Sequence, residues 1–158
     1  MLIPLFLLWI GNAATKPLKA DRILIEKAAR RLTLLDHGRA VKTYHICLGK
    51  NPVGANEREG DGRTPEGLYT IDSRNAASKY HRALHVSYPN AADRARARRL
   101  GVKPGGQIMI HGLPSRWGIL GKTAQYFDWT AGCIAVNDAE IEEIWNAVPN
   151  GVGVEIRP

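Results

Sequence analysis

Cys133 and His111 are the residues of this chain whose types and surroundings could support covalent chemistry. A cysteine nucleophile needs a nearby base, a group that orients this base, and N–H donors that stabilise an oxyanion. Cys133 follows Gly132, which lacks a side chain and so leaves room for a substrate and for a sharp turn. The backbone amides of Gly132 and Cys133 are therefore candidate oxyanion donors. A cysteine buried for structural reasons is the alternative interpretation.

Five histidines are available as the base, at positions 37, 45, 81, 85 and 111. His37 lies in a predicted hairpin turn, and His45 lies in the middle of a predicted strand. His111 ends the apolar run GGQIMIHG, whereas Cys133 begins the apolar run CIAV. If these two strands are neighbours, their ends bring His111 and Cys133 together. Isolated cysteines and histidines in a protein core are also common, so the pattern alone leaves both interpretations open.

The elements that must position this pair begin with a predicted antiparallel β-meander. Apolar and polar residues alternate over three short runs, at 23–25, 32–35 and 41–48. Gly38 lies in the turn between the last two runs, where a positive φ is needed. Cys47 belongs to the third run and is interpreted as a core residue, and nothing in its spacing requires a disulfide with Cys133.

The remaining chain alternates loops, strands and two helices. Gly, Pro and charged residues predict a long exposed loop after the meander, and the run LYTIDSR predicts a strand. One helix is predicted from Asn90, a suitable N-cap, to Gly101. A second helix follows Asn137, with Glu140 placed for a capping box. A last strand, VGVEIRP, completes a fold that we predict to be mostly β, with two helices.

The composition fits one globular domain and indicates neither a disordered chain nor a coiled coil. Of 158 residues, 44% are hydrophobic and 23% are charged. A formal net charge of +7 favours anionic partners such as nucleic acid, acidic lipid or a carboxylate-rich polymer. The arginines at positions 94, 96, 98 and 99 are interpreted as a solvated helix face.

The first residues resemble an export signal. The chain is apolar from Leu2 to Ile10 and then becomes small and polar, with candidate cleavage positions near Ala13 and Ala14. The apolar core is too short to span a bilayer comfortably, and no basic residue precedes it. We therefore expect residues 1–20 to be a leader and the folded domain to occupy residues 21–158. An N-terminal strand is the alternative.

Three segments together resemble the active-site pattern of the L,D-transpeptidase (YkuD-type) catalytic domain. They are RTPEGLYTI at 63–71, the dipeptide His111-Gly112, and TAGCIAVN at 130–137. The resemblance implies a β-rich fold, a mixed sandwich or barrel-like sheet, over nearly all of the chain from residue 21. It also implies cysteine acyl transfer on peptidoglycan stem peptides, with no cofactor and no bound metal.

The resemblance assigns roles to individual residues. It makes Cys133 the nucleophile, His111 the base, and Gly112 the residue whose backbone carbonyl orients the imidazole. Gly132 and Cys133 supply oxyanion amides, and Thr130 belongs to the same substrate-binding segment. Apart from the resemblance, the loop at residues 59–67 is predicted to bring Arg63 to a stem-peptide carboxylate, which its guanidinium suits, although a solvated loop is the alternative.

Aromatic residues offer candidate walls for a substrate groove. Tyr88, together with Tyr80 and His81, is predicted either to line the groove or to pack in the core. Trp117 and Trp129 form either a hydrophobic lid or part of the core.

This sequence departs from the family pattern at Ala131, where the family usually has a second histidine, and at Ala135, where a polar residue is common. The departures leave cross-link formation and hydrolysis of peptidoglycan attachments both open. A non-catalytic peptidoglycan-binding module and a zinc peptidase using His81, His85 and His111 are further alternatives. We expect an exported, periplasmic or wall-facing monomer with no nucleic-acid partner.

Overall fold

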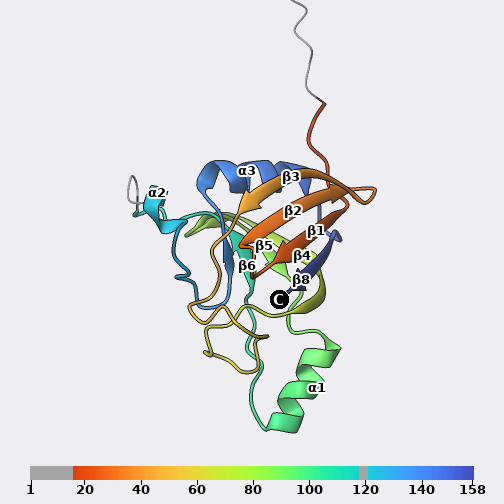
Figure 1. The fold of residues 1–158 in the computed structure, drawn as a ribbon, viewed down its shortest axis with the longest axis vertical. Helices are drawn as coiled ribbons and strands as arrows, with labels where there is room; N and C mark the ends of the chain where they lie inside the picture. Colours follow the sequence, from red (N-terminus) through yellow and green to blue (C-terminus); the bar gives the residue numbers. More distant parts are fainter. Residues whose placement is uncertain (1–15, 118–120) are drawn as a thin grey trace, which may run out of the picture.

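The computed structural model describes residues 16–117 and 121–158, so most of the predicted leader lies outside the described residues. Eight strands form one sheet in the order β3-β2-β1-β8-β4-β5-β6-β7 (Figure 1). The strands are β1 Arg22–Glu26, β2 Arg31–Asp36, β3 Arg39–His45, β4 Gly67–Ser78, β5 His81–Val86, β6 Met109–His111, β7 Ile134–Ala135 and β8 Gly153–Arg157. The helices are α1 Ala91–Leu100, the short α2 Gly121–Ala124 and α3 Asp138–Ala147. The prediction of a mostly β fold is confirmed.

The predicted β-meander is present as β1, β2 and β3, which pair antiparallel. His37 and Gly38 form the turn between β2 and β3, both with positive φ. Ile23 and Ile25 of β1 share one face of the strand and are fully buried. The third strand ends at His45, earlier than the sequence pattern predicts. Cys47 instead makes an isolated bridge with Ala135, which ties the meander to the segment after Cys133.

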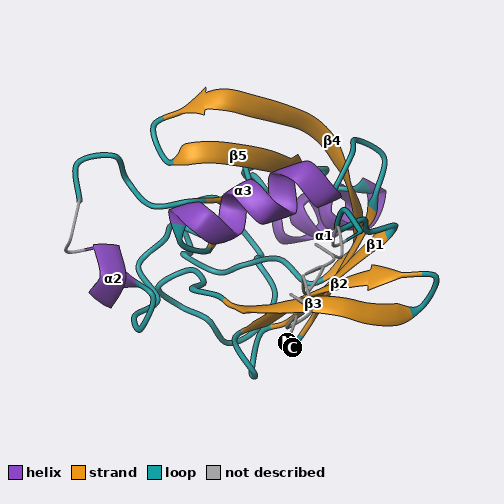
Figure 2. Cartoon of the chain, turned by 90° about the horizontal axis from the view of Figure 1, so that it is seen from above, coloured by secondary structure: helices purple, strands orange, loops and turns teal. Residues whose placement is uncertain are grey.

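The sheet is mixed and continuous because two strands link its halves. β8 pairs in parallel with β1 and antiparallel with β4, so the last strand of the chain lies in the middle of the sheet. β4 pairs with β8 over its first residues and with β5 over the rest. Figure 2 shows the long β4–β5 pair on one side of α3 and the β2–β3 pair on the other. The single sheet therefore curls around α3, in agreement with the sandwich-like fold that the resemblance predicted.

Both predicted long helices are confirmed, together with their caps. Asn90 and Asn137 each accept a hydrogen bond from the backbone of the third helical residue, in complete capping boxes. α3 buries Ile141 and Ile144 in the core. α1 lies at the lower end of the molecule in Figure 1 and buries only Asp93 and Ala97.

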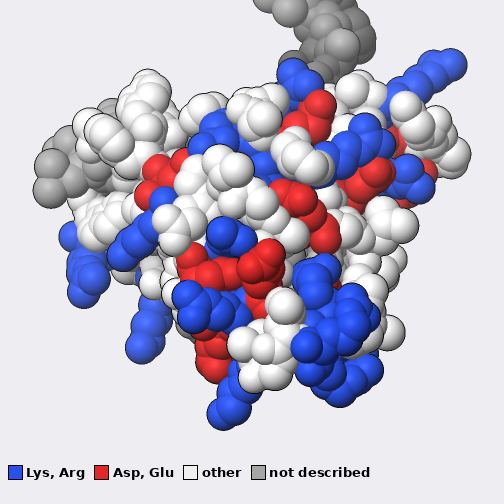
Figure 3. All heavy atoms as spheres, turned by 60° about the horizontal axis from the view of Figure 1, so that its bottom comes forward, with Lys and Arg blue, Asp and Glu red and all other residues white. Residues whose placement is uncertain are grey.

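The arginine-rich face of α1 is exposed, as predicted, with only Arg96 of its four arginines partly buried. Figure 3 shows Lys and Arg side chains gathered on the end of the molecule where α1 lies. Within residues 16–117 and 121–158, no helix has both the length and the apolar character needed to cross a bilayer.

The predicted long loop between β3 and β4 contains no named strand, yet a buried lysine holds it in place. Lys27, which is 2% exposed, follows β1. Its ammonium donates to the carbonyls of Gly54 at 2.6 Å and Thr64 at 3.0 Å, and to the Glu66 carboxylate at 2.8 Å. A buried ammonium satisfied by three acceptors pins the loop against the sheet.

Candidate active site

The register of two short parallel strands brings Cys133 close to His111. β6 and β7 pair Ile110 with Ile134 and His111 with Ala135, which sets Cys133, just before β7, level with Met109. Side chains two residues apart on a strand share a face, so Cys133 and His111 are diagonal neighbours on one face. The sequence predicted neighbouring strands whose ends meet. The strands are indeed neighbours, and because each is so short, a parallel pairing still brings the two residues together.

His111 is held in one tautomer by its neighbour. The imidazole Nδ1 lies 2.7 Å from the Gly112 carbonyl oxygen, which can only accept, so Nδ1 carries the proton. The lone pair therefore belongs to Nε2. His111 is 2% exposed, and burial lowers its pKa below the usual 6.5, partly opposed by this hydrogen bond. The ring is neutral at pH 7 and can accept a proton.

Cys133 is a protonated thiol in the resting protein. Burial raises the pKa of the Cys133 thiol above its usual 9.0. Its Sγ lies 3.5 Å from the Gln107 carbonyl oxygen, a weak contact in which the thiol donates. The site therefore pairs a neutral thiol with a neutral imidazole. In such a pair the base removes the thiol proton as the sulfur attacks, and a stable thiolate is not required beforehand.

A tight turn fixes the position of Cys133. The Thr130 hydroxyl donates to the Cys133 carbonyl at 2.7 Å and accepts from the Gly132 amide at 3.1 Å. Gly132 has a φ of +132°, and a Cβ there would lie 2.8 Å from the Arg63 carbonyl oxygen. A glycine is thus required here both by the positive φ and by the lack of space for a Cβ. Because the Gly132 amide already has an acceptor, the Cys133 amide is the better candidate for an oxyanion donor than Gly132.

An ion pair that the sequence analysis missed anchors the start of this turn. The Arg30 guanidinium donates to the Asp128 carboxylate at 2.6 Å, and the same carboxylate accepts the Leu48 amide at 2.9 Å. The Thr130 amide in turn donates to the Leu48 carbonyl at 3.2 Å. Arg30 and Asp128 are 98 residues apart, so no local pattern in the sequence could have indicated this contact.

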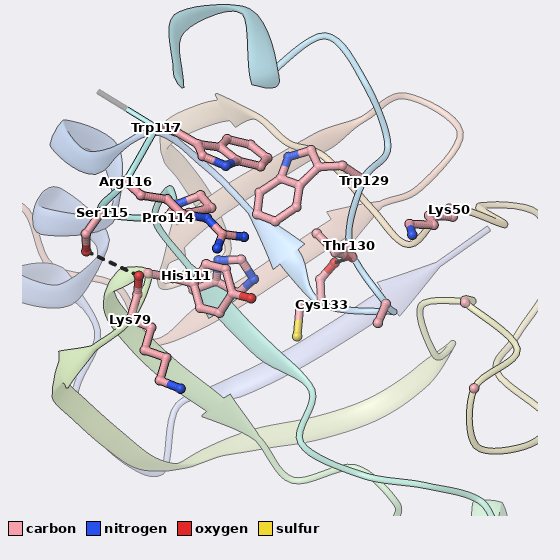
Figure 4. Close-up of a pocket in the computed structure, with 14 residues that line it drawn as sticks. Lys50, Lys79, His111, Pro114, Ser115, Arg116, Trp117, Trp129, Thr130 and Cys133 are labelled. Carbon is pink, nitrogen blue, oxygen red and sulfur yellow. Dashed lines mark hydrogen bonds between the residues drawn. The ribbon is translucent and has the colours of Figure 1, made fainter. Parts of the chain in front are cut away.

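The pair opens into a cavity of about 740 Å³ with aromatic walls. The centroid of the Tyr80 ring lies 4.4 Å from that of the His111 ring. The ring centroids of Trp117 and Trp129, which Figure 4 shows side by side, lie 4.7 Å apart. The two tryptophans therefore line the cavity, and neither is fully buried in the protein core. A cavity of this size suits a peptide-sized ligand with an apolar portion.

Among the described residues that line the cavity, the charged side chains are all cationic: Lys50, Lys79 and Arg116. Ala131, where the family usually has a second histidine, also lines it and is exposed. His111 is thus the only histidine among the described residues that line the cavity, and none of those residues is a carboxylate.

Other predicted substrate contacts lie away from the cavity. The Arg63 side chain pairs with Glu57 at 3.5 Å, and only its backbone reaches Gly132. Tyr88 is 4% exposed, and its hydroxyl donates to the Pro104 carbonyl at 2.7 Å. Neither residue is among those that line the cavity, whereas Tyr80 and Thr130 are.

The geometry does not favour a zinc site on the predicted histidines. His81 contacts Glu142 at 2.8 Å, and His85 contacts Asp72. Both histidines lie on β5, where residues four apart are separated by about 13 Å. They cannot converge on one ion from an extended strand.

Comparison with known proteins decides the family. The model of the L,D-transpeptidase catalytic domain (YkuD) matches residues 20–156. The chain belongs to the L,D-transpeptidase catalytic-domain family. The YafK protein of Escherichia coli K12, named provisionally as an L,D-transpeptidase, is 30% identical over 128 residues, which are 79% of this chain and 42% of YafK.

Solved structures of L,D-transpeptidases and related proteins share the fold. The helical cell shape determining protein Pgp2 of Campylobacter jejuni superposes with a TM-score of 0.68 at 28% identity, over 85% of this chain and 46% of Pgp2. An L,D-transpeptidase of Xylanimonas cellulosilytica superposes with a TM-score of 0.56 at 16% identity, over 90% of this chain and 63% of that structure. This L,D-transpeptidase-family chain spans less than half the length of YafK and of Pgp2.

Proposed function

We propose that this domain is an exported cysteine acyltransferase that cleaves L-to-D peptide bonds in peptidoglycan stem peptides. The observation that carries the proposal is the pairing of Cys133 with a buried, neutral His111 in one fixed tautomer, at the floor of an aromatic cavity. A purely structural histidine needs neither a free Nε2 nor an adjacent thiol. Membership of the L,D-transpeptidase catalytic-domain family supports peptidoglycan stem peptides as the substrate class.

The chemistry follows from the protonation states of the pair. As Cys133 Sγ bonds to the scissile carbonyl carbon, the thiol proton passes to His111 Nε2. The Cys133 amide donates to the oxyanion, and the Gly112 carbonyl stabilises the imidazolium through Nδ1–H. His111 then protonates the leaving amine as the C–N bond breaks. This leaves a thioester on Cys133 and releases the D-amino acid.

A second reactant completes the cycle. An amine or a water molecule gives its proton to His111 Nε2 and attacks the thioester, and the returning proton restores the Cys133 thiol. An amine makes a cross-link, whereas water makes the enzyme a hydrolase. Hydrolysis is the second candidate function, because Lys50, Lys79 and Arg116 repel a cationic ammonium acceptor but not water.

The test of the proposal is covalent capture on the thiol. Carbapenem treatment followed by mass spectrometry should place an acyl adduct on Cys133, and Cys133→Ala should lose both the adduct and turnover of purified muropeptides while remaining folded. Cys47→Ala is the matched control and should keep both. Wild-type turnover by Cys133→Ala would disprove the mechanism. Product analysis with and without an added amine then separates transferase from hydrolase.

A further inference from the structure

The end of helix α1 carries a second basic region, outside the cavity. α1 lies at the lower end of the molecule in Figure 1, and Figure 3 shows Lys and Arg side chains gathered at that end. Four exposed cations make up the region: Arg94, Arg98 and Arg99 of α1, and Lys103 just beyond it. Within the described residues, none of the four pairs with a carboxylate, whereas Arg96 of the same helix pairs with the buried Asp93. The four charges are therefore available to an external anion.

Two apolar side chains lie among these cations. Leu100 is 55% exposed and Val102 is 36% exposed. Leu100 follows Asp93 and Ala97 on one stripe of α1, and both of those residues are buried against the domain. An apolar residue at the next position of a buried stripe would ordinarily be covered as well. Leu100 is left uncovered because the last turn of α1 extends past the body of the domain, as Figure 1 shows.

The neighbouring acids leave the region positive. The loop between β3 and β4 approaches it, and the Glu59 amide donates to the Lys103 carbonyl at 2.8 Å. Two other acids of that loop are already engaged: Glu57 by the Arg63 guanidinium, and Asp61 by backbone amides. Glu59 balances one of the four cations, so a net positive charge remains at the end of α1.

The combination of cations and apolar side chains indicates which anion fits. Cations in the last turn of a helix interact favourably with its dipole, and they attract any polyanion. A soluble polyanionic chain, however, gains nothing from the exposed Leu100 and Val102. The surface of an anionic lipid bilayer suits both kinds of side chain, because its headgroups attract Lys and Arg and its acyl chains accept apolar groups at the boundary.

We propose that the end of α1 docks on the surface of an anionic lipid bilayer. The four cations contact the lipid headgroups, and Leu100 and Val102 enter the boundary between headgroups and acyl chains. The protein then lies on the membrane and does not span it. This inference goes beyond the proposed acyl transfer and does not depend on it, since it assigns a partner to a surface outside the cavity.

The docking surface is close to the Cys133 thiol along the chain. Gln107 follows Lys103 by four residues, so their α-carbons are at most about 14 Å apart. The Gln107 carbonyl oxygen lies 3.5 Å from Cys133 Sγ. A bilayer docked on the end of α1 therefore lies near the segment that contacts the thiol, and the cavity works close to the membrane.

Co-sedimentation with lipid vesicles tests the docking. The full chain is mixed with vesicles of phosphatidylcholine alone, and with vesicles in which about a third of the lipid is phosphatidylglycerol. The wild-type protein should bind the anionic vesicles more tightly than the neutral ones, and high salt should weaken this preference. Residues 1–15 are identical in every protein compared, so differences between variants report on the substituted positions.

Removing the charges should weaken binding to the anionic vesicles. Replacing Arg98, Arg99 and Lys103 together by Gln should weaken it about 100-fold, at about fivefold for each cation. A matched control removes three exposed cations from the other end of the molecule in Figure 1: Lys16→Gln, Lys19→Gln and Arg39→Gln. The control protein should bind like wild type.

Removing the apolar side chains separates a lipid surface from a polyanion. Leu100→Gln combined with Val102→Thr should weaken binding to the anionic vesicles about three- to tenfold and leave its salt dependence in place. Val41→Thr, on β3, changes a valine that is 40% exposed and is the control for Val102→Thr. It should bind like wild type.

The outcomes decide between the membrane and the alternatives. Equal binding to neutral and anionic vesicles, no measurable binding to the anionic vesicles, or equal losses in the two triple variants would overturn the inference. Unchanged vesicle binding by the Leu100→Gln, Val102→Thr variant, together with binding of soluble polyphosphate, would assign the region to a polyanion instead. The assay contains no peptide substrate, so its result is independent of the adduct on Cys133.

Discussion

Replacing Gly132 by alanine tests whether the turn before Cys133 holds the nucleophile in place. Two costs apply at this position. The φ of +132° is strained for any residue with a Cβ, and the new Cβ would meet the Arg63 carbonyl oxygen at 2.8 Å and Ile108 Cδ1 at 3.3 Å. The carbonyl belongs to the backbone and cannot rotate away, so either Gly132 or Arg63 must move by about half an ångström.

The two costs can be estimated and separated. Backbone strain contributes about 1–3 kcal/mol and the overpacked contact another ~1–3 kcal/mol, so Gly132→Ala should lower the free energy of unfolding by about 2–6 kcal/mol. Gly151 has a φ of +89° and open space around its Cβ position, so Gly151→Ala reports strain without a clash. Gly153 also has open space but no positive φ, and Gly153→Ala should be nearly neutral.

Urea unfolding of the three variants gives the free energies, and muropeptide turnover reports on the site. Because a displacement of about 1 Å can cost about 100-fold in rate, Gly132→Ala should lose most activity even where it remains fully folded. The Gly151→Ala and Gly153→Ala variants should keep wild-type activity. If Gly132→Ala is as stable as Gly153→Ala, the close approach to the Arg63 carbonyl is not a constraint, and the account of the turn is wrong.

Three other perturbations probe the groups around the pair. Asp128→Asn keeps an acceptor for the Leu48 amide but removes the charge that faces Arg30. This variant should lower the free energy of unfolding by about 1–2 kcal/mol and should lower turnover. An unchanged turnover would show that the ion pair does not position the turn. Burial holds the pKa of His111 below 6.5 and that of Cys133 above 9.0, so the unfolded chain binds more protons just below pH 6.5 and fewer just above pH 9. The free energy of unfolding should therefore decrease as the pH falls below 6.5 and as it rises above 9. His111→Gln should weaken the decrease on the acid side, as measured by denaturation at a series of pH values. An unchanged pH dependence in this variant would contradict a buried, neutral imidazole. Iodoacetamide should label only Cys133 in the folded protein and both cysteines after denaturation. The reason is that Cys47 is 2% exposed and burial raises its pKa to about 11. Rapid labelling of Cys47 in the folded state, detected by peptide mass spectrometry, would refute its assignment to the core.

Local features of the structure could be predicted because short-range physics decides them. Asn90 and Asn137 cap helices through bonds to residues three positions away, and the Gly38 turn depends on its own φ. The run MIHG and the run CIAV are apolar enough to be recognised as buried strands. These local patterns made Cys133 and His111 candidates among the two cysteines and five histidines of the chain, and the resemblance to the family pattern then favoured that pair.

The substrate contacts could not be assigned in the same way. Arg63 and Tyr88 have residue types suited to ligand binding, but Arg63 pairs with Glu57 and the Tyr88 hydroxyl binds the Pro104 carbonyl. Residue type states which contacts a side chain can make. Which contacts it does make depends on the packing of segments that are far apart in the chain.

The sequence by itself determined the capped helices and the mostly β character of the fold, since these depend on residue type and short-range periodicity, and its resemblance to the family pattern singled out Cys133 and His111 as the candidate pair. Only the tertiary structure decided that β6 and β7 run parallel and that Arg30 supports the turn through Asp128. It also gathered Lys50, Lys79 and Arg116 around one cavity. These features join residues separated by up to 98 positions, and the burial that brings them together is a property of the whole core.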